Sequence, residues 1–177
     1  AGNDHRLGAS EAPPAIISIY LGDQLTSILE TITMEGCCTK SDRQFVKMGI
    51  TMLPQLPKDL TDRNRTSPIA FTGNKFEYRM VGSSQSMADP NIYINAAVAH
   101  VLEEVAVRLE KAQDIEQEAH AIIRDFYQGH KRIVFNGNGY SKEWKEEALQ
   151  RGLPDFKDTV SALPQMASEK SIELFEK

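Results

Sequence analysis

The sequence predicts an α+β protein that is predominantly helical and has a few antiparallel strands. Apolar residues recur every three or four positions over 12–33 and over 94–126, which is the spacing of a helix face. Residues 69–81 comprise a short apolar stretch, a glycine-containing connection and a stretch in which charged and apolar residues alternate, as in a β-hairpin. The 177 residues are 41% hydrophobic and 25% charged, so the chain can bury a core without disulfides or metals.

The first predicted helix covers residues 12–33. It opens with Pro13 and Pro14, which a first helical turn accepts because its N–H groups have no partner within the helix. Its apolar face comprises Ile17, Leu21, Leu25, Ile28 and Ile32. After a loop, residues 45–53 predict a strand that ends before Pro54 and Pro57.

The next predicted element is the hairpin. Its first strand is residues 69–71, its connection is Thr72-Gly73-Asn74, and its second strand is residues 75–81. The small-polar stretch 82–89 follows and separates the hairpin from the helical second half of the chain.

The second half predicts helices. A pattern that can begin at Pro90 continues to Phe126, as one very long helix or as two helices that break near Gln113-Asp114. Ser141 is a suitable N-terminal cap for a helix that runs to Arg151. Two shorter helices are expected over 156–163 and 168–177, and Trp144 is expected to pack in the core.

The charge balance argues against a nucleic-acid-binding protein. The 20 Lys and Arg residues are outnumbered by 25 Asp and Glu residues, whereas nucleic-acid binding needs a basic face. No apolar run approaches the ~20 residues that span a bilayer, and there is no signal-peptide pattern. We therefore expect a cytoplasmic protein. Its adjacent Cys37 and Cys38 are expected to stay reduced, because a disulfide between neighbours is strained.

Both ends suggest a piece of a longer protein. The sequence starts at Ala1 without a methionine, and the final helical pattern, 168–177, has no stop signal.

One strand of the predicted hairpin carries the residues best suited to chemistry. Lys75, Glu77 and Arg79 share one face, because side chains alternate along a strand. The common interpretation is a solvated charged face. The alternative is a face inside a cavity, where the carboxylate holds a divalent cation and the two cations hold a phosphate or carboxylate.

Two further clusters support the second interpretation. Residues 62–68 join two guanidinium groups, those of Arg63 and Arg65, to hydroxyls within one turn, and planar guanidinium donors match phosphate oxygens. Residues 2–14 form a glycine-punctuated charged loop, and such loops often gate sites. The alternatives are surface ion pairs for the first cluster and a frayed terminus for the second.

These clusters together resemble the C-terminal half of a glutamine synthetase active site. The matching stretches are RLGASEAP at 6–13, NRTS at 64–67 and KFEYR at 75–79, in that order. The resemblance is closest to the type III, large-subunit branch of the family and extends over essentially the whole chain.

The resemblance implies a ligase that makes glutamine from glutamate and ammonia with ATP, through a γ-glutamyl phosphate. It implies a site that holds Mg²⁺ or Mn²⁺, strands that form part of a catalytic barrel, and a homo-oligomer. On this basis residues 1–88 are part of the catalytic domain and residues 89–177 are a helical region. Because the family's other metal ligands lie upstream, the isolated chain is expected to be inactive.

The resemblance also assigns roles to individual residues. Glu77 would be a metal ligand. Arg6 would bind glutamate, Arg79 would bind glutamate or stabilise the phosphoryl group, and Glu11 would help to take a proton from the incoming ammonium. Two further residues would contact the phosphate or nucleotide, namely Arg65, which is also catalytic, and Lys75. These roles suit phosphoryl transfer, which depends on positioning and on charge neutralisation.

Two alternatives remain open. One is a non-catalytic helical scaffold in which residues 90–127 pack against partners in an oligomer. The other is a related γ-glutamyl ligase that uses an amine in place of ammonia. His100 and His120 are expected to form helix-surface pairs with glutamates, and the role of His130 is left open.

Overall fold

The computed structural model describes residues 14–35, 45–46, 56–57, 67–80 and 85–176. Its helices are α1 (Gly22–Glu35), α2 (Ala88–Glu110), α3 (Ile115–His130), α4 (Lys142–Gln150), α5 (Thr159–Ala162) and α6 (Glu169–Phe175), with 3-10 helices η2 (Lys131–Ile133) and η3 (Leu163–Ala167). Its strands are β1 (Ile19–Tyr20), β2 (Phe45–Val46), β3 (Leu56–Pro57), β4 (Ile69–Phe71) and β5 (Phe76–Tyr78). The prediction of an α+β, predominantly helical protein is confirmed.

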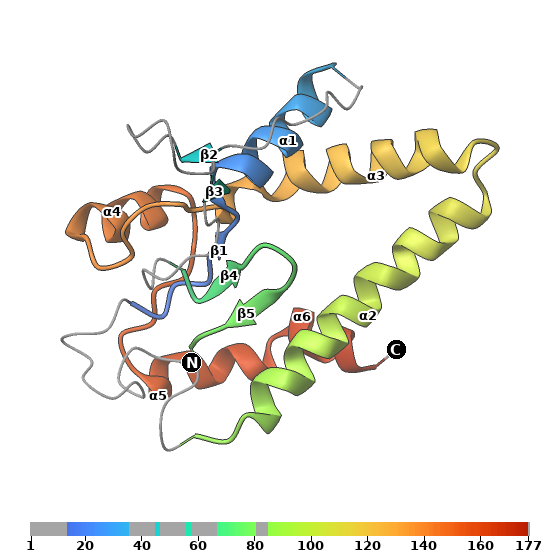
Figure 1. Cartoon of the computed structure of the whole chain (residues 1–177). Coiled ribbons are helices and arrows are strands. Elements are labelled where there is room, and N and C mark those ends of the chain that lie inside the picture. Colours follow the sequence, from blue (N-terminus) through green and yellow to red (C-terminus); the bar gives the residue numbers. More distant parts are fainter. Residues whose placement is uncertain (1–13, 36–44, 47–55, 58–66, 81–84, 177) are drawn as a thin grey trace.

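Figure 1 shows how these elements surround a small sheet. Helices α1 and α3 lie side by side, and α2 extends from beside α6 to the loop that precedes α3. Helix α4 lies on the other side of the sheet from α2. Along the chain, α5, η3 and α6 come after α4. No helix in the described ranges has both the length and the apolar composition needed to cross a membrane.

The sheet has the order β1-β4-β5. The predicted hairpin is confirmed, because β4 and β5 are antiparallel with Ala70 opposite Glu77. The connection between them contains Gly73 at φ +91°, a backbone conformation that favours glycine. Strands β2 and β3 form a separate antiparallel pair; residues 47–53 of the predicted strand 45–53 lie outside the described residues.

The sheet is mixed, since β1 pairs with β4 in parallel, which the prediction of antiparallel strands did not include. Within the described ranges the strands form this open sheet and the separate pair, and no closed barrel.

The prediction of a helix over 12–33 is wrong for residues 14–21, because α1 begins only at Gly22 and is preceded by β1; residues 12 and 13 lie outside the described residues. Distant segments hold this stretch extended. The Phe135 N–H donates to the Ile19 carbonyl at 2.9 Å. The Leu21 and Gly22 N–H groups donate to Asn136 Oδ1 at 3.0 and 3.1 Å. Gly22 itself has φ +74°, a left-handed backbone that would not continue a helix.

The long helical pattern of the second half is two helices, as one of the two predictions had it. The break lies over residues 111–114, and the Asp114 side chain caps α3 by accepting from the Gln117 N–H at 3.0 Å. Ser141 caps α4 as predicted, by accepting from the Trp144 N–H at 3.1 Å. Gly152, at φ +68°, follows the end of α4.

The main hydrophobic core joins an N-terminal residue to α4 and the residues after it. It contains Ile16, Trp144, Ala148 and Leu153, with Ile133 and Phe135 packed against it. The Trp144 ring stacks on Phe135 at a centroid distance of 3.7 Å. The prediction that Trp144 packs in the core is confirmed.

Helix α2 is different, since it contains no buried residue. Its large exposed apolar side chains are Ile92, Ile94, Val98, Val101, Leu102 and Val107.

Candidate functional site

The charged face of β5 is formed as the sequence predicted. Lys75 Nζ lies 3.1 Å from Glu77 Oε1, and Arg79 Nη2 lies 3.0 Å from Glu77 Oε2. Arg79 Nε also donates to Glu77 Oε2, at 3.3 Å. The three side chains form a ladder in which the carboxylate lies between two cations.

The hairpin fixes the backbone under this ladder. The Arg79 N–H donates to the Pro68 carbonyl at 2.7 Å, and the Thr72 N–H donates to the Lys75 carbonyl at 2.8 Å. Ala70, which pairs with Glu77 across the two strands, is fully buried. Side-chain exposure falls from 66% for Lys75 to 38% for Glu77 and 24% for Arg79. The Lys75 end of the ladder is therefore exposed to solvent, and the Arg79 guanidinium at the other end is partly shielded.

The two cations set the electrostatics of the ladder. The hydrogen bond from Arg79, and then that from Lys75, lower the pKa of the Glu77 carboxyl below its ordinary value. Glu77 is therefore ionised at neutral pH. Among these three side chains two cations flank one carboxylate, and guanidinium and ammonium groups suit an anionic group such as a carboxylate or a phosphate.

A divalent cation does not fit the described residues by themselves. Both oxygens of Glu77 are already paired with cations. Within the described ranges no cluster of three or more His, Cys, Asp or Glu side chains is able to hold a metal. Divalent cations bind several oxygen ligands, and the single carboxylate of Glu77 supplies only one or two of them.

The remaining predicted site residues lie outside the described residues. They are Arg6, Glu11 and Arg65. Cys37 and Cys38 lie outside them as well. The structure therefore brings together Lys75, Glu77 and Arg79, the part of the predicted site that belongs to the hairpin.

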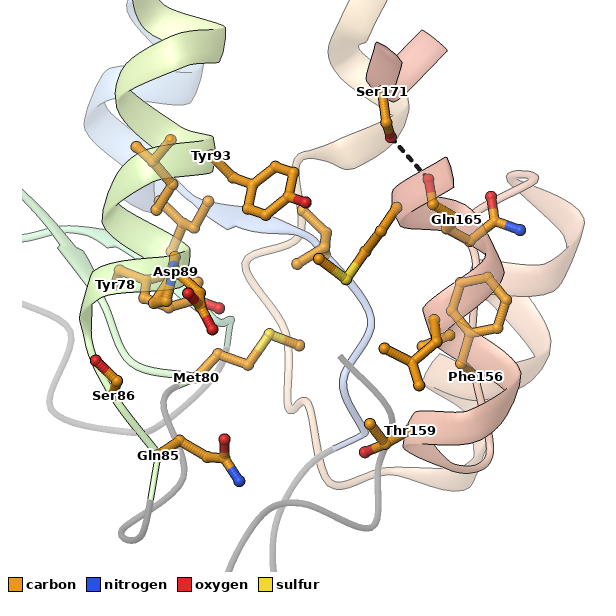
Figure 2. A pocket seen from close by; sticks show the side chains of 17 residues that line it. Tyr78, Met80, Gln85, Ser86, Asp89, Tyr93, Phe156, Thr159, Gln165 and Ser171 are labelled. Atoms are coloured by element: carbon orange, nitrogen blue, oxygen red, sulfur yellow. Dashed lines mark hydrogen bonds between the residues drawn. The ribbon is translucent and has the colours of Figure 1, made fainter. Parts of the chain in front are cut away.

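A cavity of about 570 Å³ opens on the opposite side of the hairpin. Figure 2 shows Tyr78 and Met80 on one wall and Phe156 and Thr159 on the other, with Tyr93 of α2 above them. The Ser171 hydroxyl donates to the Gln165 carbonyl at 2.7 Å at the rim. This cavity could not be predicted from the sequence, because its walls come from three distant segments; the alternation that places Tyr78 and Met80 on one face is its sequence signal.

The structure shows partners for two of the histidines, His100 and His130. His100 Nε2 lies 3.5 Å from Glu104 Oε1, as the predicted surface pair requires. The His130 ring stacks on Phe126 at 6.3 Å. The Nδ1 atoms of His100 and His120 are buried and have no hydrogen-bond partner among the described residues.

Comparison with known proteins gives one consistent result. Residues 118–177 match the family model of the glutamine synthetase C-terminal domain. The chain is 49% identical to the type-3 glutamine synthetase of Dictyostelium discoideum over 98% of its own length and 24% of that protein. It is 42% identical to the glutamine synthetase of Bacteroides fragilis, over 97% of the chain and 24% of that protein.

A third relative, the glutamine synthetase of Butyrivibrio fibrisolvens, is 41% identical over 99% of the chain and 25% of that protein. The chain thus spans about a quarter of the length of the relatives that it matches. The resemblance inferred from the sequence motifs is confirmed, and the chain is similar, over almost its whole length, to a segment of these glutamine synthetases.

Proposed function

We propose that this chain is part of an ATP-dependent glutamate–ammonia ligase that makes glutamine through a γ-glutamyl phosphate. The observation that carries this proposal is the similarity of nearly the whole chain to type-3 glutamine synthetase. The Lys75–Glu77–Arg79 ladder supports it, because it presents an ammonium and a partly shielded guanidinium, and such cations suit an enzyme whose substrate, intermediate and nucleotide are all anions.

In this proposal the described residues bind and orient anions. Arg79, the less exposed cation, contacts glutamate, and the outer Lys75 contacts a phosphate. Their positive charge offsets the negative charge of the transferred phosphoryl group. Glu77 supplies one carboxylate ligand for Mg²⁺ or Mn²⁺, and the other ligands come from outside the described residues.

Three residues outside the described ranges complete the proposed site. Arg6 contacts glutamate, Arg65 lies near the transferred phosphate, and Glu11 covers the site and helps to deprotonate ammonium. Exclusion of water is needed because an acyl phosphate hydrolyses readily.

The wider setting is part of the same proposal. Residues 1–88 belong to the catalytic domain, where the strands continue into a barrel, and residues 89–177 form a helical region. The full-length protein is a cytoplasmic homo-oligomer. Fractionation of cells, followed by size-exclusion chromatography of the soluble protein, tests location and assembly directly.

Phosphate release is the decisive test of the activity. The full-length protein that contains this chain is expected to release phosphate from ATP only when glutamate, ammonium and Mg²⁺ are all present. The isolated chain, with one metal-ligand carboxylate on its hairpin, is expected to release none above background. A full-length protein that needs a primary amine in place of ammonium would be the related γ-glutamyl-amine ligase instead.

One observation favours a second candidate function, a helical scaffold without catalysis. Helix α2 has no buried residue and exposes several large apolar side chains. In that case the full-length protein would assemble through α2 and would not bind a phosphorylated glutamate analogue. Tight binding of such an analogue, measured by calorimetry, would exclude the scaffold.

A further inference from the structure

Two buried hydroxyl groups connect segments that are far apart in the sequence. Ser18 and Ser67 are 0% and 4% exposed, and they are the buried polar residues of the described ranges. The Ser18 hydroxyl donates to Ser67 Oγ at 3.0 Å. The Ser67 hydroxyl donates in turn to the Phe135 carbonyl at 3.1 Å. Both hydroxyl protons of this relay are thus used.

The relay lies where three chain segments meet. The Ile69 N–H, at the start of β4, donates to the Ser18 carbonyl at 3.4 Å. The Phe135 N–H donates to the Ile19 carbonyl at 2.9 Å. Phe135 is itself held by its ring, which stacks on Trp144 in the core. Its carbonyl is therefore a rigid anchor for the hydroxyl of Ser67.

The next residue links this anchor to the charged ladder. The Pro68 carbonyl accepts the Arg79 N–H at 2.7 Å, a backbone hydrogen bond that lies just outside the β4–β5 pairing. Two residues further along, Ala70 pairs with Glu77. A shift of Ser67 would therefore move the backbone of both Arg79 and Glu77.

We infer that Ser67 is a positioning residue: its hydroxyl fixes the start of β4 to the Phe135 carbonyl, and this contact sets the place of Arg79 and Glu77. The consequence for catalysis rests on the proposed function. Phe135 belongs to the region 118–177 that matches the family model, so this region helps to position the charged ladder although none of its residues is part of the ladder.

The chemistry of the position explains why a hydroxyl is needed. An alanine at 67 would leave the Phe135 carbonyl and the Ser18 hydroxyl without these partners in a buried place, which favours a rearranged backbone. A buried polar network with all its members paired holds one arrangement, whereas a network with one member missing does not.

The test compares two substitutions in the full-length protein that contains this chain. Ser67→Ala removes both bonds of the relay, whereas Ser18→Ala is the same chemical change at an equally buried site and leaves the Ser67–Phe135 bond. Ser67→Thr keeps the hydroxyl and serves as the conservative variant. The measurements are the KM for glutamate, the Mg²⁺ concentration at half activation, the melting temperature, and hydrogen exchange of residues 69–79.

Ser67→Ala is expected to raise the KM for glutamate and the half-activating Mg²⁺ concentration about tenfold, as residues that support ligand-binding groups commonly do. Ser18→Ala is expected to change them about threefold or less, the effect of one neutral hydrogen bond. Exchange over 69–79 should rise in Ser67→Ala and much less in Ser18→Ala, and Ser67→Thr should stay near the wild type.

The inference is overturned if both alanine variants lower the melting temperature equally and leave KM, Mg²⁺ activation and exchange over 69–79 unchanged. A Ser67→Thr variant as impaired as Ser67→Ala, at an unchanged melting temperature, would also overturn it. If the wild-type protein shows no ammonium-dependent phosphate release, the proposed function fails, and the exchange data alone decide whether Ser67 holds the hairpin.

Discussion

The region around Trp144 buries its apolar side chains, whereas helix α2 leaves most of its large apolar side chains exposed. Around Trp144, short segments from residues 16, 133–135 and 144–153 bury one another. Helix α2 is the longest helix described and has no buried residue, although most of its sequence between Pro90 and Leu102 is apolar and none of it carries a carboxylate, lysine or arginine. A helix that is apolar on most sides is typically buried. The buried core and the longest apolar helix therefore lie in different parts of this chain.

The largest effect is expected at Trp144. Trp144→Ala removes a 2% exposed ring that stacks on Phe135 and should lower the free energy of unfolding by about 3–5 kcal/mol. Urea unfolding monitored by far-UV circular dichroism measures it. The matched control is Leu149→Ala on the same helix, where the side chain is 78% exposed and the cost should be within about 0.5 kcal/mol. Equal costs for the two variants would contradict the location of the core.

A smaller effect is expected at Asn136, which ties the core region to α1. Its Oδ1 accepts the Leu21 and Gly22 N–H groups, and its Nδ2 donates to Thr26 Oγ1 at 3.0 Å. Asn136→Ala should lower the free energy of unfolding by about 1–3 kcal/mol, because it leaves partly buried N–H groups unpaired. It should also speed amide exchange in α1. Asn138→Ala, which removes one exposed contact to the Tyr140 N–H, should do neither, and a similar loss in both variants would count against this role.

These contacts also show why part of the fold could not be predicted from the sequence. The helix caps at Asp114 and Ser141 and the hairpin at Gly73 depend on neighbouring residues, and local patterns predicted them. The extended stretch before Gly22 depends on residues 135 and 136, more than 110 positions away. The three- and four-residue spacing of its apolar residues therefore predicted a helix where tertiary hydrogen bonds form a strand.

The same distinction applies to the candidate site. Alternation along one strand was enough to place Lys75, Glu77 and Arg79 on one face. The Ser18–Ser67–Phe135 relay was not predictable in this way, because serine is common in loops and a backbone carbonyl leaves no sequence signal. The cavity beside Tyr78 and Tyr93 could not be predicted from the sequence either, because its lining residues come from distant segments of the chain.

The smallest effect on stability is expected on α2. Leu102→Gln replaces a 58% exposed apolar side chain by a polar one of similar helix propensity and should change the free energy of unfolding by less than about 0.5 kcal/mol. The matched change Ile122→Gln, at a 5% exposed position of α3, should cost about 2 kcal/mol or more. Thermal and urea unfolding of both variants decide this, and a large loss at Leu102 would show that α2 is buried in solution.

The last prediction concerns the titration of the Glu77 carboxyl in the charged ladder. The pKa of Glu77 is lowered chiefly by the hydrogen bond from Arg79 and then by that from Lys75. Because the folded pKa is depressed, the stabilisation from these pairs is fully present above the unfolded pKa of a glutamate and is lost as pH falls through the depressed folded value. Arg79→Gln should therefore raise the titration midpoint of the Glu77 carboxyl, observed by carbon NMR, more than Lys75→Gln does. About 1 M salt should also move the midpoint toward its ordinary value, because the pair is partly exposed. A midpoint that neither substitution changes would mean that the ladder does not form in solution, and the anion-binding face of β5 would have to be abandoned.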